Sequence, residues 1–261
     1  MTIRIMAWRW LGIAAVVCGL GTTALRADDK ESRWTSTNLP LEKLSPELRE
    51  RLTKVVDHPA VYTHGPMDEI VCDAPTYFWL LDHPDRATRA WCRLGAKCVD
   101  IRDAGNDSFT CSDTNGNDVR WSTVYRSPEM RIWYAEGTIK VGALVKPVTG
   151  EAVLVVRHVE GTDAKGRTVI RQQTDMIVHA DSKTATLVAK LLGATMPQLA
   201  EQYIVHQGKF FSLLATYLWA HPNKVSALLA PRSPDEESES ALTFPTSPTK
   251  AKDAMKGTAP K

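Results

Sequence analysis

The middle of the chain alternates apolar and polar residues over six short segments, which is the pattern of strands with one buried face. In one of them Val119, Trp121, Thr123 and Tyr125 fall on the same side. Short connections separate the segments, and Asn-Gly at 115–116 is a strong hairpin signal. Because such short turns join only antiparallel neighbours, we expect an antiparallel meander. Its predicted strands are 97–103, 108–113, 118–127, 129–141, 151–161 and 168–180.

Helical spacing and strand-like runs alternate before the meander. Ser45 can cap free backbone amides and Pro46 suits the first helical position, so a helix is expected over 47–56. Gly65-Pro66 is a turn signal between two short apolar runs. The predicted strands and helices after the first helix are, in order, strands 60–64 and 67–73 and helices 75–81 and 85–95.

Two helical segments, 182–194 and 198–221, follow the last predicted strand. Apolar residues recur at intervals of three and four along the longer one, which predicts a wide stripe that packs against the sheet. By pattern alone, core packing is favoured over ligand contact for its aromatic residues. The stripe contains Ala200, Tyr203, Ile204, Gln207, Phe210, Phe211, Leu214, Tyr217 and Leu218.

The first 27 residues have the pattern of a secretory signal peptide. Arg4 and Arg9 precede a run of 15 uncharged residues that ends before Arg26. That run is shorter than the roughly 20 residues needed to span a bilayer, so cleavage after Ala27 is favoured over an uncleaved membrane anchor. We therefore expect export to the periplasm or the extracellular space, with residues 28–59 as an N-terminal extension that contains one helix.

The C-terminal residues 231–261 are rich in Pro, Ser, Thr, Lys and Glu and contain little to bury. Such a composition cannot offset its ordering entropy, so a disordered tail is expected. The region between signal and tail has the size of one domain. Removing the three signal arginines takes the net charge from +2 to −1. Near-neutral charge without a basic cluster argues against a nucleic-acid partner.

Four of the 5 cysteines lie beyond the signal segment, at 72, 92, 98 and 111, and they allow three disulfide pairings. Export would place them where disulfides persist. Cys98 and Cys111 flank the turn that contains 104–107, so they are the first choice for a bond across a hairpin. No CxxC occurs, and the spacings match no zinc-ligand pattern.

The sequence contains no strong catalytic or metal-binding motif. The 7 histidines are not accompanied by HExxH, GxSxG or a phosphate-binding Gly-rich loop. The segment that begins at Asp113 resembles a calcium loop, but Asp118 and Val124 stand where such a loop needs Gly and Glu. The sequence therefore assigns no catalytic residue, no metal and no cofactor.

The order of these elements resembles the START-like superfamily, also called SRPBCC. The resemblance covers residues 60–222, and it is carried by element order, by MDEIVCDAPTYFWLLDHPDRATRAW and by the aromatic helix led by Pro197. It implies an α+β helix-grip fold, in which a curved antiparallel sheet of about seven strands wraps a long C-terminal helix. Two short helices follow the first strand in this fold.

In that superfamily a mostly apolar cavity lies between the sheet and the C-terminal helix. The resemblance implies Trp121 and Tyr125 of the sheet and Tyr203, Phe210 and Tyr217 of the helix as cavity residues. The leading hypothesis is an exported domain that holds a hydrophobic small molecule or lipid. The alternatives are a cyclase-like or hydrolase-like enzyme, and a filled-core module that binds another protein of the cell envelope.

Overall fold

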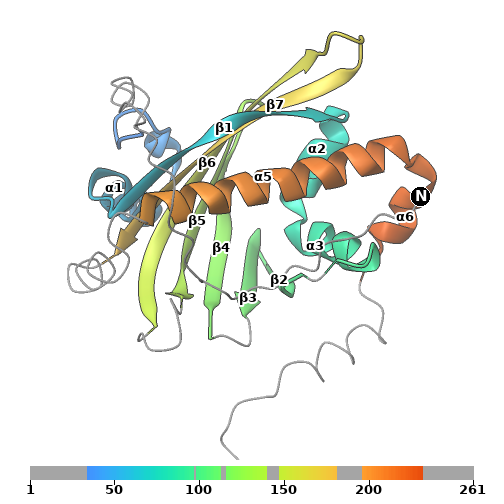
Figure 1. Ribbon diagram of the computed structural model, residues 1–261. Coiled ribbons are helices and arrows are strands. Elements are labelled where there is room, and N and C mark those ends of the chain that lie inside the picture. The colour runs from blue at the N-terminus through green and yellow to red at the C-terminus, as the bar shows by residue number, and fades with distance from the viewer. Residues whose placement is uncertain (1–33, 97, 113–115, 140–146, 181–195, 232–261) are drawn as a thin grey trace, which may run out of the picture.

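The computed structural model describes residues 34–96, 98–112, 116–139, 147–180 and 196–231. Within these ranges one antiparallel sheet of seven strands, in the order β1-β7-β6-β5-β4-β3-β2, forms the centre of the molecule (Figure 1). The predicted meander is confirmed as β2 to β7, and β1 adds beside β7. The strands are β1 Val61–Val71, β2 Ile101–Gly105, β3 Ser108–Ser112, β4 Asp118–Arg126, β5 Met130–Ile139, β6 Val148–Thr162 and β7 Thr168–Ala180.

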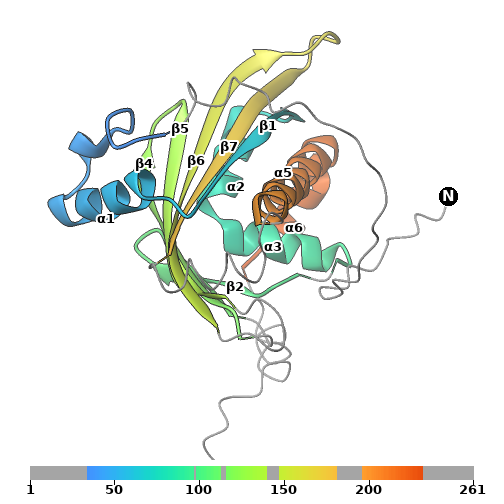
Figure 2. The same cartoon turned by 60° about the vertical axis from the view of Figure 1, so that its left-hand side comes forward.

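Three predictions from the sequence fall outside the described residues: the signal peptide, the helix over 182–194 and the disordered tail. The α+β class and the helix-grip arrangement are confirmed by the sheet and by the long helix α5, Met196–Ala220, that lies across it. Figure 2 shows the sheet curving around α5 and α3 (Pro84–Arg93), with α1 (Pro46–Asp57) on the other side. We call the face toward α5 the inner face and the face toward α1 the outer face.

The two strands predicted on either side of Gly65-Pro66 are one strand, β1, with an irregularity between His64 and Met67. At Gly65 the strand lies close to β7 and to α5. A Cβ added at Gly65 would lie 2.6 Å from the Thr174 carbonyl oxygen and 2.6 Å from Ile204 of α5. The glycine therefore marks a close approach of strand and helix, and the predicted turn at this position is wrong.

The N-terminal extension folds onto the outer face. The 3₁₀ helix η1, Leu41–Lys43, leads into α1, where Ser45 Oγ accepts a hydrogen bond from the Leu48 amide at 3.3 Å. Pro46 occupies the first helical turn, as predicted. Leu52, Val55 and Val56 on one side of α1 are buried, so the helix packs its apolar face on the sheet.

Helices α2, Ala74–Asp82, and α3 follow β1 on the inner side. The carboxylate of Asp73 accepts hydrogen bonds from the Thr76 amide at 2.8 Å and from the Thr76 hydroxyl at 2.9 Å, which caps α2. His83 separates the two helices, and its ring stacks on Trp79 with 4.2 Å between centroids. The described part of the chain ends after the 3₁₀ helix η3, Pro222–Lys224, and the short helix α6, Val225–Leu228.

Two buried clusters lie on opposite sides of the sheet. The outer cluster joins α1 and the N-terminal segment to the outward residues of the central strands. The inner cluster joins α2, α3, α5 and α6 to β1 and β7, and it contains Leu214, Ala215 and Leu218 of α5. Because both faces carry apolar residues, neither face of the sheet is simply the solvent side.

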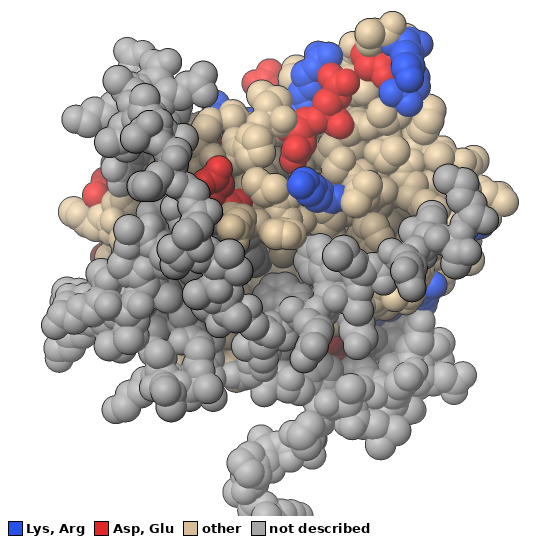
Figure 3. All heavy atoms as spheres, in the orientation of Figure 1, with Lys and Arg blue, Asp and Glu red and all other residues tan. Residues whose placement is uncertain are grey.

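Charged residues of both signs mix on the face of the molecule shown in Figure 3. They gather at its upper end, where the β6–β7 hairpin lies, rather than in a patch of one sign. No helix in the described part of the chain is long and apolar enough to cross a membrane.

Candidate ligand-binding face of the sheet

The central strands bury their outward side chains more completely than their inward ones. Strand residues alternate between faces, so each outward residue has inward neighbours in the same strand. The outward residues of the central strands are buried: Ile132, Tyr134, Val153, Val155 and Ile177. Their inward neighbours are only half-buried: Trp133, Ala135, Ala152, Leu154 and Met176. The centre of the inner face is thus less tightly covered than the outer face.

Two rows of paired residues make up this central area. One row runs across the sheet through Thr63, Met176, Leu154, Trp133 and Thr123. The next row runs through Val61, Val178, Ala152, Ala135 and Trp121. In the second row the two alanines lie between the valines and Trp121, and Trp133 of the first row lies two positions from Ala135 in the same strand. Ala135 and Ala152 therefore form a shallow area with bulkier, mostly apolar side chains beside it, which we call the alanine floor.

The long helix α5 packs chiefly on β1, with a smaller contact to β7. Glycines allow this approach at two points. Gly65 of β1 lies against Ile204, and a Cβ on Gly208 of α5 would lie 2.5 Å from Asp68 Oδ2. The helix is therefore held close to one edge of the sheet, while the alanine floor belongs to strands nearer the middle.

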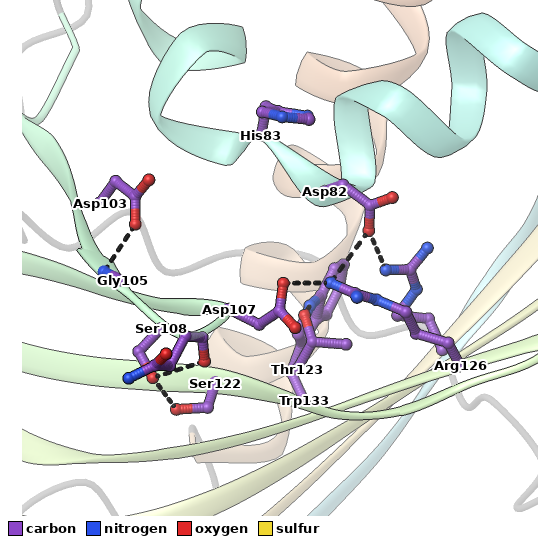
Figure 4. Close-up of polar contacts among 12 residues, drawn as sticks. Asp82, His83, Asp103, Gly105, Asp107, Ser108, Ser122, Thr123, Arg126 and Trp133 are labelled. Atoms are coloured by element: carbon purple, nitrogen blue, oxygen red, sulfur yellow. Dashed lines mark hydrogen bonds and ion pairs between the residues drawn. The ribbon is translucent and has the colours of Figure 1, made fainter.

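A polar cluster lies at one end of this area, at the corner between α2 and α3 (Figure 4). Asp82 forms ion pairs with Arg131 and, at 3.4 Å, with Arg126 Nη2. Arg126 also contacts Asp107 Oδ1 at 2.6 Å. Arg131 is 3% exposed, so its charge depends on the carboxylate of Asp82 for compensation. Two cations and two anions balance within the cluster.

The indole of Trp133 links the apolar area to this polar end. Its Nε1 donates a hydrogen bond to Thr123 Oγ1 at 3.0 Å (Figure 4). Ser108 and Ser122, on the neighbouring strands, share a hydrogen bond at 2.7 Å between their hydroxyls. Ser122 pairs with Tyr134 on the outer face, so on the inner face it is the Thr123 hydroxyl that bonds to Trp133. The half-exposed Arg126 lies three positions further along β4.

Titratable groups inside the inner cluster are held in their neutral forms. Burial raises the pKa of Tyr77, whose hydroxyl donates to Gln172 Oε1 at 2.8 Å. His158 packs edge-on against Tyr77 and Phe78, with centroids 5.4 Å and 5.0 Å away. Burial, and then the nearby charge of Arg131, hold the pKa of His158 below its usual range. These groups are built into the core and present no exposed reactive atom.

Asp68 is the acid of β1 that points to the inner side, opposite Gln172 of β7. Burial raises the pKa of its carboxyl, and Lys209 of α5 lowers it by a smaller amount. A carboxyl with a raised pKa beside an apolar area is a candidate for proton transfer. In the described residues no group of three or more His, Cys, Asp or Glu is placed to hold a metal ion.

Of the five cavity residues implied by the resemblance, the four whose side chains the structure describes do not lie together. Trp121 lies half-buried on the inner face, 5.8 Å from the ring of Phe109. Tyr125 lies on the outer face, because an irregularity in β4 between Thr123 and Tyr125 pairs Tyr125 with Ile132. Its hydroxyl accepts a hydrogen bond from Lys43 Nζ at 3.3 Å, so this prediction of a cavity position is corrected.

The helix residues also differ from the expectation. Phe210 contacts Trp91 of α3, with 5.2 Å between ring centroids. Tyr217 stacks on His221 at 4.2 Å, near the C-terminal end of α5. The side chain of Tyr203 lies outside the described residues. The sequence reasoning missed Trp133, Ala135, Ala152 and Leu154, although they were within predicted strands and on their inward alternation.

Cys98 and Cys111 are also apart in the ladder. Cys111 of β3 pairs with Ile101 of β2, two positions from Asp103, where the turn begins. Cys98 lies before β2, and its thiol contacts Cys92 of α3. Cys98 and Cys111 are therefore not opposite each other across the β2–β3 hairpin, which was the reason for predicting a disulfide between them.

No family model matches the sequence, and no curated protein matches it either. Among solved structures, a conserved protein from Geobacillus kaustophilus is 14% identical, with 61% of this chain and 95% of that chain covered and a TM-score of 0.39. Norcoclaurine synthase from Thalictrum flavum is 18% identical, with 59% and 85% covered and a TM-score of 0.34. The di-domain ARO/CYC BexL of the BE-7585A biosynthetic pathway is 13% identical, with 66% and 54% covered and a TM-score of 0.35. Because these likenesses are so distant, the ligand and activity of this chain have to be inferred from its own residues.

Proposed function

We propose that the chain is an exported START-like domain that binds a hydrophobic or amphipathic small molecule between the inner face of the sheet and α5. The observation that carries the proposal is the half-burial of Trp133, Leu154 and Met176, whose outward neighbours are fully packed. When an apolar ligand covers large apolar side chains that are partly exposed, the removal of their surface from water favours binding.

The shape of the area favours a ligand with one polar end. Its apolar body would lie over Ala135 and Ala152, flanked by the two tryptophans of β4 and β5. Its polar end would reach Arg126 and the hydroxyl of Thr123, which lie toward the α2–α3 corner. The charge balance of that corner favours a neutral oxygen-bearing group over a strongly anionic one.

A pair of alanine substitutions tests the site. Ala152→Leu adds volume to the floor, whereas Ala164→Leu makes the same change on an exposed residue of the β6–β7 turn. The probe is the neutral apolar dye N-phenyl-1-naphthylamine, titrated by fluorescence. We expect Ala152→Leu to weaken dye binding about tenfold, or about 1.4 kcal/mol, because the larger side chain occupies space that the dye would fill. Equal affinity of the two variants and the parent would refute the site.

A second experiment separates ligand binding from the filled-core alternative. The chain is purified from the producing cell and studied by native mass spectrometry before and after extraction with organic solvent. An added mass that disappears on extraction, and that is absent from Ala152→Leu, supports the binding function. Bare protein in every sample, with no dye binding, would favour a filled core that acts through its surface.

Asp68 supports an enzyme as the second candidate function, since its carboxyl has a raised pKa and lies on the inner side. In that case Asp68→Asn should abolish turnover of the extracted compound without loss of its binding. Export is tested separately, by sequencing the N-terminus of the secreted chain. Cleavage after Ala27 would leave Asp28 as the first residue.

A further inference from the structure

The end of α3 reverses the chain so that it returns toward its own helix. The Ala96 amide donates to the Trp91 carbonyl at 3.0 Å, and the Gly95 amide donates to the Cys92 carbonyl at 2.9 Å. Gly95 has φ +88°, the left-handed conformation that glycine adopts without strain. This pair of hydrogen bonds is the Schellman closure of a helix, and it determines the direction in which the next residues leave.

This reversal brings Cys98 to the last turn of α3. Its thiol lies near the thiol of Cys92 and also donates to the Ala96 carbonyl, with 3.9 Å between Sγ and O. Cys92 is exposed and Cys98 is half-buried, so an oxidant can reach the pair from solvent. Cys72 is wholly buried, and Cys111 faces Ile101 and Val119 on its neighbouring strands.

We propose that Cys92 and Cys98 are a redox-active pair that forms a disulfide when the chain meets a small-molecule or protein disulfide. The Cys92 thiolate attacks glutathione disulfide, forms a mixed disulfide and releases one glutathione. The Cys98 thiolate then attacks the Cys92 sulfur and releases the second glutathione. The two cysteines lose two protons and two electrons, and glutathione disulfide is reduced to two glutathione thiols.

Their surroundings determine the order of attack. The hydrogen bond with Cys92, and then burial, raise the pKa of the Cys98 thiol above its ordinary value. The exposed Cys92 meets the oxidant first, whereas the half-buried Cys98 is less accessible to it. Once Cys92 carries a good leaving group, its contact with Cys98 favours the second attack.

The bond would link two layers of the fold. Helix α3 contacts α5 through Trp91 and Phe210, and Arg93 donates to the carbonyls of Leu228 at 2.8 Å and Ala230 at 2.9 Å. Cys98 lies on the connection into β2, the edge strand of the sheet. Oxidation thus ties the helical layer to the sheet edge, and an exposed bond of this kind is readily reduced again.

Trypsin digestion separates all the relevant cysteines. Cleavage after Arg89, Arg93, Lys97 and Arg102 releases the peptides AWCR and CVDIR, which carry Cys92 and Cys98. The full chain is incubated in glutathione disulfide, alkylated with iodoacetamide, digested without reductant and analysed by mass spectrometry. We expect AWCR joined to CVDIR as the main cross-linked product, and its loss after dithiothreitol.

Matched variants make the result decisive. Cys111→Ser should leave the AWCR–CVDIR product unchanged, whereas Cys92→Ser should leave CVDIR alkylated. Circular dichroism checks that each variant is folded. CVDIR joined to the peptide of Cys111, or AWCR and CVDIR both alkylated in folded, oxidant-treated protein, would overturn the proposal. Hydrogen exchange over 98–105 should slow on oxidation of the parent and stay unchanged in Cys92→Ser.

Discussion

Trp34 donates its indole N–H to Asp175, with 2.6 Å between Nε1 and Oδ2, although 141 positions separate the two residues in the sequence. Asp175 is 0% exposed and also contacts His64 and, at 3.4 Å, Arg157. The Arg157 guanidinium lies over the Trp34 ring, 5.4 Å from its centroid. The N-terminal segment is thus bonded to the outer face at a buried carboxylate.

Trp34→Phe removes the indole donor and keeps an aromatic ring. Because Asp175 is buried, the loss of a donor should cost about 1–3 kcal/mol in the free energy of unfolding. Urea unfolding followed by circular dichroism measures this change. Trp219→Phe, at an exposed position of α5, is the control and should change stability by less than about 0.5 kcal/mol. Equal effects of the two changes would contradict the role of the Trp34–Asp175 bond.

Asp82→Asn should destabilise the fold strongly, because it leaves the buried guanidinium of Arg131 without its carboxylate. Breaking a buried ion pair from one side typically costs about 3–5 kcal/mol. Arg126→Gln removes a half-exposed partner of the same carboxylate, so its cost should be at most about 1 kcal/mol. Thermal melts of both variants show which substitution lowers stability more. A larger loss in Arg126→Gln would show that Arg131 does not depend on Asp82.

Two adjacent leucines of α5 provide a test of the helix orientation. Leu214 is 0% exposed and Leu213 is 60% exposed. Leu214→Ala should lower the free energy of unfolding by about 2–5 kcal/mol, and Leu213→Ala should change it by less than about 0.5 kcal/mol. Chemical denaturation of both variants measures the difference. Similar values would mean that α5 is rotated about its axis from the orientation described.

His158 should make stability depend on pH. Its pKa is lowered in the folded chain by burial and by Arg131, so the unfolded chain binds the proton first as the pH falls. Stability should therefore decrease from about pH 6.5, the unfolded value, down toward the lower folded pKa, by up to about 1.4 kcal/mol per pH unit. Urea unfolding at about pH 7 and about pH 5 measures the slope.

His158→Gln should remove this part of the pH dependence. His206→Gln, on the exposed side of α5, is the matched control and should retain the slope of the parent chain. If His158→Gln kept the full slope, another titrating group would have to account for it.

Local patterns predicted the elements well. Apolar alternation located the strands of the meander, and the short connections required antiparallel neighbours, as found in β2 to β7. The Ser45-Pro46 signal predicted the start of α1, where Ser45 caps the helix. These features depend on residues close together in the chain, so one sequence contains the information for them.

The assignment of side chains to faces was less predictable. Strict alternation in β4 placed Tyr125 beside Trp121, but the irregularity after Thr123 moves Tyr125 to the outer face. The position of a β-bulge depends on how the strand pairs with its neighbouring strand. In β4 the neighbour is β5, and the bulge pairs Tyr125 with Ile132. Because α1 covers the outer face, both faces of the sheet carry apolar residues. The apolar pattern therefore could not show which face lies toward α5.

The sequence by itself determined the strand segments, the helices, their order and hence the antiparallel helix-grip sheet, because periodicity and turn residues act over a few positions. Only the tertiary structure decided which side chains meet. Phe210 lies in the apolar stripe of α5, yet it contacts Trp91 because α3 packs against that side of the helix. Cys98 meets Cys92 rather than Cys111 because the Schellman closure reverses the chain after α3. Such contacts depend on bulges, on the rotation of helices and on packing between distant segments. The free energy of each contact therefore depends on the complete fold and not on neighbouring residues in the sequence.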